Sequence, residues 1–63
     1  MARAQSPAYC MGFARAQSAG ARMGKYNLSP STMDHEEYGS LWGAFLAGWW
    51  AGLRDAARED WGS

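Results

Sequence analysis

At 63 residues with a formal net charge of zero, the chain has room for one small domain, residues 1–63, and is neither strongly basic nor strongly acidic. Cys10 is the only cysteine, which excludes a disulfide within the chain, and Cys10 and His35 are too few for a metal site. The charge is unevenly divided, because residues 1–33 hold four cations and no acid whereas residues 34–63 hold six acids and two cations. This asymmetry favours an anionic partner for the first half, or pairing between the halves.

The first predicted element is a helix over residues 7–24. Ser6 followed by Pro7 is a start signal, because serine caps helices and proline is tolerated at the first helical position. Gly24 is expected to end the helix. Apolar and small side chains recur at spacings of three and four and predict its buried face: Tyr9, Phe13, Ala16, Gly20 and Met23.

Turn-forming residues predict a connection over residues 25–31. A second helix is then expected over residues 32–58, capped by Ser29, Ser31 or Thr32 and followed by a frayed tail. Its first turns hold carboxylates, which favour the positive end of the helix dipole: Asp34, Glu36 and Glu37.

The second helix carries most of the aromatic surface. Its apolar stripe is wider than the roughly 100° of an ordinary amphipathic helix. We predict a protein interface on it formed by Trp42, Phe45, Leu46, Gly48, Trp49, Trp50 and Leu53. One short partner helix cannot cover so wide a stripe. The predicted fold is therefore an all-α two-helix hairpin, a helix-turn-helix unit, completed by dimerisation.

Glycines lie four residues apart in two pairs of this helix, Gly39 with Gly43 and Gly48 with Gly52. Each interior glycine costs roughly 1 kcal/mol relative to alanine. Small residues at this spacing allow a second backbone to approach closely, so we predict close helix packing at both pairs. The uncharged run at residues 38–53 is shorter than the roughly 20 apolar residues of a membrane-spanning helix, and no span is expected.

No arrangement typical of an enzyme is present, and we expect no catalysis, no metal and no cofactor. The stretch GARMGK has a glycine four residues before a Gly-Lys pair, but Tyr26 follows where a phosphate-binding loop needs serine or threonine. The cations of the first half could instead neutralise RNA phosphates, which predicts salt-sensitive RNA binding through Arg3, Arg15, Arg22 and Lys25.

The second helix contains an aromatic-Leu-small-Gly-Trp run: Phe45, Leu46, Ala47, Gly48 and Trp49. Small residues, glycines and a proline precede the helix: Ala19, Gly20, Gly24 and Pro30. With these motifs, residues 13–56 resemble the ribosome modulation factor family and its small relatives. The chain departs from the strongly basic members of that family in being neutral, and in having Trp50 where the family has an arginine.

The resemblance implies a cytoplasmic protein of bacterial or phage origin. It would bind the small ribosomal subunit and its RNA and promote ribosome hibernation, a form of translation regulation without catalysis. The alternative is a phage or mobile-element inhibitor that docks its aromatic helix face on a host protein complex. RNA binding predicts an affinity that falls steeply with salt, whereas aromatic docking predicts loss on Trp→Ala substitution.

Overall fold

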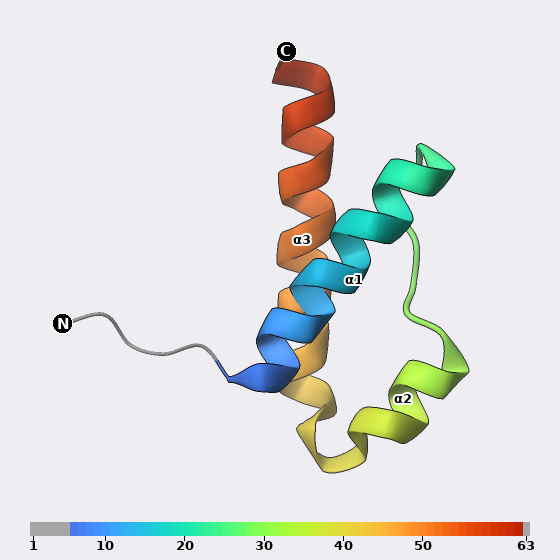
Figure 1. The fold of residues 1–63 in the computed structure, drawn as a ribbon, viewed down its shortest axis with the longest axis vertical. Helices are drawn as coiled ribbons and strands as arrows, with labels where there is room; N and C mark the ends of the chain where they lie inside the picture. The colour runs from blue at the N-terminus through green and yellow to red at the C-terminus, as the bar shows by residue number, and fades with distance from the viewer. Residues whose placement is uncertain (1–5, 63) are drawn as a thin grey trace, which may run out of the picture.

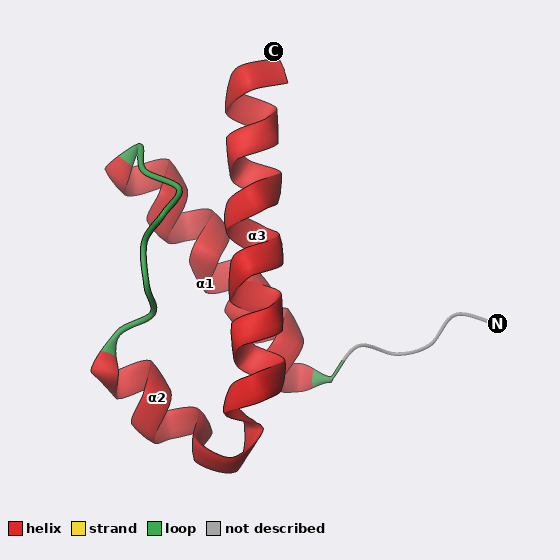
Figure 2. Cartoon of the chain, turned by 180° about the vertical axis from the view of Figure 1, so that it is seen from behind, coloured by secondary structure: helices red, strands yellow, loops and turns green. Residues whose placement is uncertain are grey.

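In the computed structural model, which describes residues 6–62 and the side chains up to residue 60, two long helices cross and a short helix lies at one end of the crossing (Figure 1). The elements are α1 (Pro7–Met23), α2 (Thr32–Tyr38), the 3-10 turn η1 (Gly39–Leu41) and α3 (Trp42–Gly62). Figure 2, coloured by secondary structure, shows that the described residues form helices joined by short loops. The predicted all-α hairpin is confirmed, with α1 as its first arm and α3 as the main part of its second.

Helix α1 begins and ends as predicted. The Ser6 hydroxyl accepts a hydrogen bond from the Tyr9 N–H at 3.2 Å, and Pro7 occupies the first turn. Gly24 lies in the left-handed region at φ 66°, and its N–H donates to the Gly20 carbonyl at 2.8 Å. Gly24 is thus the cap that closes the helix.

The predicted single helix over residues 32–58 is wrong, because the backbone leaves helical geometry at Gly39 (φ 16°, ψ −98°) and makes a 3-10 turn before α3 begins. Its start is correct: Ser31 caps α2, and the Ser31 hydroxyl and Asp34 carboxylate each accept from the other residue's backbone N–H. Gly39 and Ser40 are weak helix formers. The bend turns α2 back toward Arg15 of α1, a contact that a straight helix would not make.

The predicted frayed tail is also wrong, since α3 continues to Gly62. No proline interrupts this part of the chain. The residues after position 58 therefore extend the helix by another turn.

Helix α1 packs on α3 through small side chains. Four residues spaced four apart are buried along α1: Ala8, Gly12, Ala16 and Gly20. The predicted buried face is correct at Ala16 and Gly20 and wrong at the other three positions, because Tyr9 and Phe13 are only half-buried and Met23 is 58% exposed. A strip of such small residues lets the two backbones come into contact.

The glycines of this crossing have no room for a side chain. A Cβ at Gly12 would lie 3.0 Å from the Trp49 backbone nitrogen, and one at Gly52 would lie 2.9 Å from the Ala16 Cβ. A Cβ at Gly48 would collide with the Tyr9 carbonyl. The predicted close approach at Gly48 and Gly52 is confirmed, and the second backbone is α1 of the same chain.

The other predicted pair behaves differently, because a Cβ at Gly39 or Gly43 would meet nothing within 4 Å. The prediction of close packing at these two glycines is therefore wrong within the hairpin.

A stack of aromatic rings fills the space beside the helix crossing. The Phe45 ring lies 4.7 Å from the Tyr38 ring, 5.3 Å from that of Trp42 and 6.3 Å from that of Trp49, measured between centroids. The Trp49 indole N–H donates to the Leu28 carbonyl at 2.8 Å and so fixes the connection to α3. Phe45 and Leu53 are the largest fully buried side chains.

Candidate interaction surfaces

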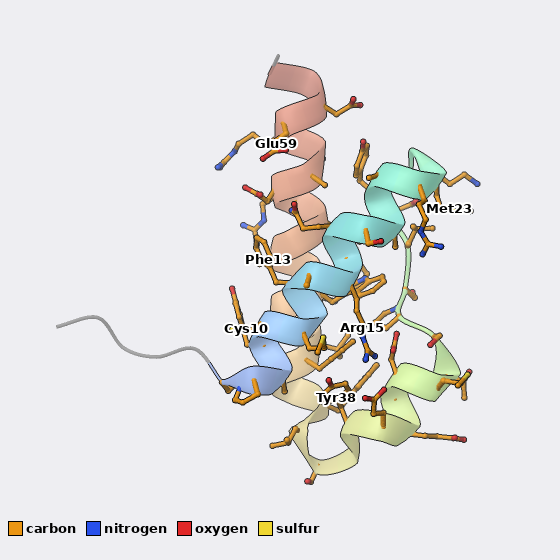
Figure 3. All side chains as sticks on the ribbon, viewed as in Figure 1. Cys10, Phe13, Arg15, Met23, Tyr38 and Glu59 are labelled. Atoms are coloured by element: carbon orange, nitrogen blue, oxygen red, sulfur yellow. The ribbon has the colours of Figure 1, made fainter. Side chains whose placement is uncertain are left out.

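Arg15 joins α1 to α2. Its Nη1 lies 2.5 Å from Asp34 Oδ1 and 3.2 Å from Glu37 Oε1, and its guanidinium carbon lies 5.5 Å from the Tyr38 ring centroid. Figure 3 shows the Arg15 side chain extending from α1 toward α2. The hydrogen bond to Glu37, with a further one to Asp34, raises the pKa of Arg15. This predicted RNA-binding residue is thus already engaged by two carboxylates of its own chain.

Of the remaining predicted RNA-binding residues, Arg22 lines the same hollow as Arg15, and Lys25 is not among the residues of that hollow. Arg22 is exposed in the last turn of α1, where its Nε donates to the Ser18 carbonyl at 3.4 Å, and Lys25 is exposed just after the Gly24 cap. Arg3 lies outside the described residues. Of the four predicted RNA-binding residues, Arg22 and Lys25 are therefore the described ones that have no ion pair with a carboxylate.

A hollow of about 370 Å³ lies between α1, the connection and the start of α2. It is lined by Arg15, Ser18, Ala19, Arg22, Ser29, Ser31, Asp34 and Trp49. The polar lining is largely occupied: Arg15 bonds Asp34, and Ser31 and Asp34 form the cap of α2. Among residues 6–60, no polar or charged side chain is buried, and no three His, Cys, Asp or Glu side chains are grouped to hold a metal.

Four members of the predicted protein interface are covered by their own chain. Phe45, Gly48, Trp49 and Leu53 are all buried, and Trp49 is only 4% exposed. The prediction is wrong for these four, because the small residues of α1 let that helix come close enough to cover them.

The other three members, Trp42, Leu46 and Trp50, keep exposed surface. Trp42 and Leu46 are half-buried, and Trp50 is 43% exposed. Trp50 follows exposed Gly43 and Ala47 at spacings of four and three, which places all three on one side of α3. We call Gly43, Leu46, Ala47 and Trp50 the outward face of α3. Figure 2 views the molecule from behind, with α3 in front of α1.

Two sets of polar contacts with α3 could not be predicted from the sequence. Gln17 Nε2 donates to the Gly52 carbonyl at 2.8 Å and to Asp55 Oδ2 at 3.1 Å. The Tyr26 ring lies over Gly20, and desolvation, together with the nearby Asp60 carboxylate, raises the pKa of Tyr26. These partners are distant in sequence, so neither periodicity nor spacing identifies them.

No protein-family model, curated protein or solved structure matches the chain. The resemblance to the ribosome modulation factor family stays a prediction. Three of the residues that carry it, Phe45, Gly48 and Trp49, are buried against α1. Packing is therefore sufficient to explain this part of the motif. No helix in the described range is both long enough and apolar enough to cross a membrane.

Proposed function

We propose that the chain is a non-catalytic binding module that docks the outward face of α3 on the surface of another protein. The observation that carries this proposal is the position of Trp50. It is 43% exposed on the side of α3 that α1 does not cover, beside Leu46 and Ala47. Tryptophan is among the residues most enriched at the energetic centres of protein interfaces.

Gly43 supports the same proposal. The glycines at the helix crossing are required by contacts with α1, whereas Gly43 is exposed in the first turn of α3 and has open space around it. A helical glycine costs roughly 1 kcal/mol relative to alanine. A partner that approaches the backbone at Gly43 would offset that cost.

The chemistry of the described side chains favours binding over catalysis. The hollow beside α2 is open, and its Arg15 and Asp34 are bonded to each other. A general acid or base needs a neighbour or an apolar environment that adjusts its pKa. Arg15 and Tyr26, the described groups whose pKa is raised, have their partners within the fold, Asp34 and Glu37 for the one and Asp60 for the other.

A second candidate is binding to ribosomal RNA in the cytoplasm, in line with the family resemblance. The exposed cations Arg22 and Lys25 favour it. With two phosphate contacts, the slope of log K against log salt would be about −1.4 for single-stranded RNA. Arg15 would add to it only by leaving Asp34 and Glu37.

The test measures capture of partners from bacterial lysate by the full chain and its variants, with ribosomes followed by co-sedimentation. Trp50→Ala should abolish capture of the docked protein. Met33→Ala is the matched control, because Met33 is an apolar side chain that is 77% exposed on α2. Combined Arg22→Glu and Lys25→Glu should leave protein capture unchanged, and binding should vary little between about 50 and about 500 mM salt. Capture of ribosomes that is salt-sensitive, lost on charge reversal and indifferent to Trp50→Ala would contradict docking and support the RNA candidate.

A further inference from the structure

A stripe of exposed side chains continues from Trp50 toward the end of α3. Trp50, Arg54 and Arg58 are all exposed and follow one another at a spacing of four residues, so they share one side of the helix. At a rise of 1.5 Å per residue, this Trp-Arg stripe is about 12 Å long. Arg54 and Arg58 are the two cations of the acidic second half of the chain, and both lie beside the tryptophan proposed to dock.

A hollow of about 250 Å³ lies next to the stripe, between α1 and α3. It is lined by Phe13, Ala51, Arg54, Asp55 and Arg58. Phe13 is half-buried and contributes an apolar surface. Asp55 is engaged within the fold, because its Oδ2 accepts a hydrogen bond from Gln17 Nε2 at 3.1 Å. The hollow therefore offers a partner an apolar surface and two arginines.

The fold does not use these two arginines. Within residues 6–60, neither Arg54 nor Arg58 has an ion pair, whereas Arg15 holds two carboxylates. The helix dipole does not account for Arg54, because its effect is limited to the last turn of a helix and α3 continues for about two turns beyond this residue.

The acids near the end of α3 do not neutralise the stripe. Glu59 and Asp60 are close to Arg58 in sequence, but they line a different hollow, together with Tyr26 of the connection. The positive charge of Arg54 and Arg58 is therefore available to a partner.

We infer that the partner docked on α3 presents an acidic segment, whose carboxylates bind Arg54 and Arg58 while an apolar side chain packs on Trp50. This inference rests on the proposed docking function and names the chemistry of the partner. The planar guanidinium group of arginine pairs with a carboxylate through two parallel hydrogen bonds. Arg54 and Arg58 are about 6 Å apart along the helix axis, which matches carboxylates four residues apart in a helix or two apart in an extended segment.

An acidic protein segment fits this surface better than RNA does. Proteins that bind single-stranded nucleic acid follow its backbone with a positively charged groove. The stripe carries two cations, and the Asp55 carboxylate lines the same hollow. A segment with two carboxylates needs no further cation, whereas an RNA backbone would bring unpaired phosphates close to Asp55.

The first experiment selects ligands for the full chain from random peptides of about twelve residues displayed on phage, a length sufficient to span the stripe. The selected peptides should carry two acidic residues, four or two positions apart, beside an apolar residue. In fluorescence anisotropy, replacing those acids by their amides should weaken binding at least tenfold. Selected peptides without acidic residues, or amide versions that bind equally well, overturn the inference.

The second experiment measures the same peptides on matched variants. Arg54→Gln combined with Arg58→Gln should weaken binding roughly tenfold or more, because charge-assisted hydrogen bonds are lost. Arg22→Gln combined with Lys25→Gln removes the same charge from another surface and should leave binding unchanged. Circular dichroism checks that each variant is folded. Equal weakening by both pairs would indicate a general charge effect and contradict the inference.

A single-stranded oligouridylate of about twelve nucleotides tests the RNA alternative. Between about 50 and about 500 mM salt, peptide affinity should fall by no more than about threefold, because exposed ion pairs are weak. Two phosphate contacts would lower RNA affinity about 25-fold over the same range. If the oligouridylate binds more tightly than the peptides and loses binding in the Arg54→Gln, Arg58→Gln variant, the stripe binds RNA and the inference is wrong.

The two proposals fail in different ways. If Trp50→Ala loses peptide binding and the Arg54→Gln, Arg58→Gln variant keeps it, the acidic partner is wrong and the docking function stands. If the arginine variant loses binding and Trp50→Ala keeps it, docking through Trp50 is wrong and the site for carboxylates stands. If neither variant changes binding, both proposals are wrong.

Discussion

Gly48→Ala should strongly destabilise the hairpin, because a Cβ at Gly48 would collide with the backbone of α1. The added methyl group would meet the Tyr9 backbone, with the Tyr9 carbonyl carbon at 2.8 Å and its Cα at 3.0 Å. These are main-chain atoms within a helix, so they cannot rotate away as the end of a flexible side chain would. The substitution must push the two helices apart along the buried strip.

The size of the effect follows from two opposing terms. Overpacking of a filled core costs about 1–3 kcal/mol, and a backbone collision belongs at the upper end of that range. Alanine recovers roughly 1 kcal/mol of helix propensity. The net loss is about 2 kcal/mol, out of a total of roughly 3–9 kcal/mol for a domain of this length. At about 4–8 °C per kcal/mol, Tm should fall by roughly 8–16 °C.

The matched control is Gly43→Ala, an identical substitution in the same helix at a position with nothing within 4 Å. It should gain up to about 1 kcal/mol. Thermal and urea unfolding, followed by circular dichroism at 222 nm, measures both variants at the same protein concentration. Equal stability of Gly48→Ala and Gly43→Ala would refute close packing at Gly48.

Three further predictions concern the helix end, the α1–α2 contact and the connection. Gly24→Ala should cost about 1–2 kcal/mol, because Gly24 has φ 66° and a side chain disfavours that conformation; Gly24→Asn should cost less in the same urea titration. Arg15→Gln should lower the free energy of unfolding by about 1 kcal/mol and speed hydrogen exchange in α2. The loss of stability should be smaller in high salt, because the ion pairs of Arg15 with Asp34 and Glu37 are partly exposed. Unchanged hydrogen exchange in α2 would contradict this prediction. Since the pKa of Tyr26 is raised in the folded state, the unfolded chain loses this proton first, so stability should fall as pH rises above about 10. Tyr26→Phe should show a smaller alkaline loss, measured as urea midpoints at successive pH values, and an unchanged profile would exclude this role.

Local signals in the sequence predicted both ends of α1 and the start of α2 correctly. Ser6, Gly24 and Ser31 cap through hydrogen bonds that span three or four residues. Such bonds depend on the identity of near neighbours, which the sequence displays directly. The break at Gly39 was missed, because its benefit comes from contacts that the bent chain makes with Arg15 and with the ring of Phe45.

Hydrophobicity alone does not identify the residues of α1 that are buried. Tyr9, Phe13 and Met23 are the more apolar or larger residues, yet Ala8 and Gly12 are the ones fully buried. Both sets recur at helical spacing, so periodicity allows either. The alanines and glycines are the residues that face α3, because a strip without long side chains lets the two backbones come close and lets α1 cover the aromatic rings of α3.

The sequence does not show which of the neighbouring tryptophans, Trp49 or Trp50, is buried and which is available to a partner. In a helix, successive residues point about 100° apart, so one of the pair faces α1 and the connection while the other faces outward. The sequence alone does not say which one, because either assignment leaves an apolar stripe of the same composition. Gly48 and Gly52 decide it: their contacts with Tyr9 and Phe13 fix the rotation of α3 against α1. With that rotation, Trp49 donates its indole N–H inside the fold and Trp50 is left as the aromatic side chain for a partner.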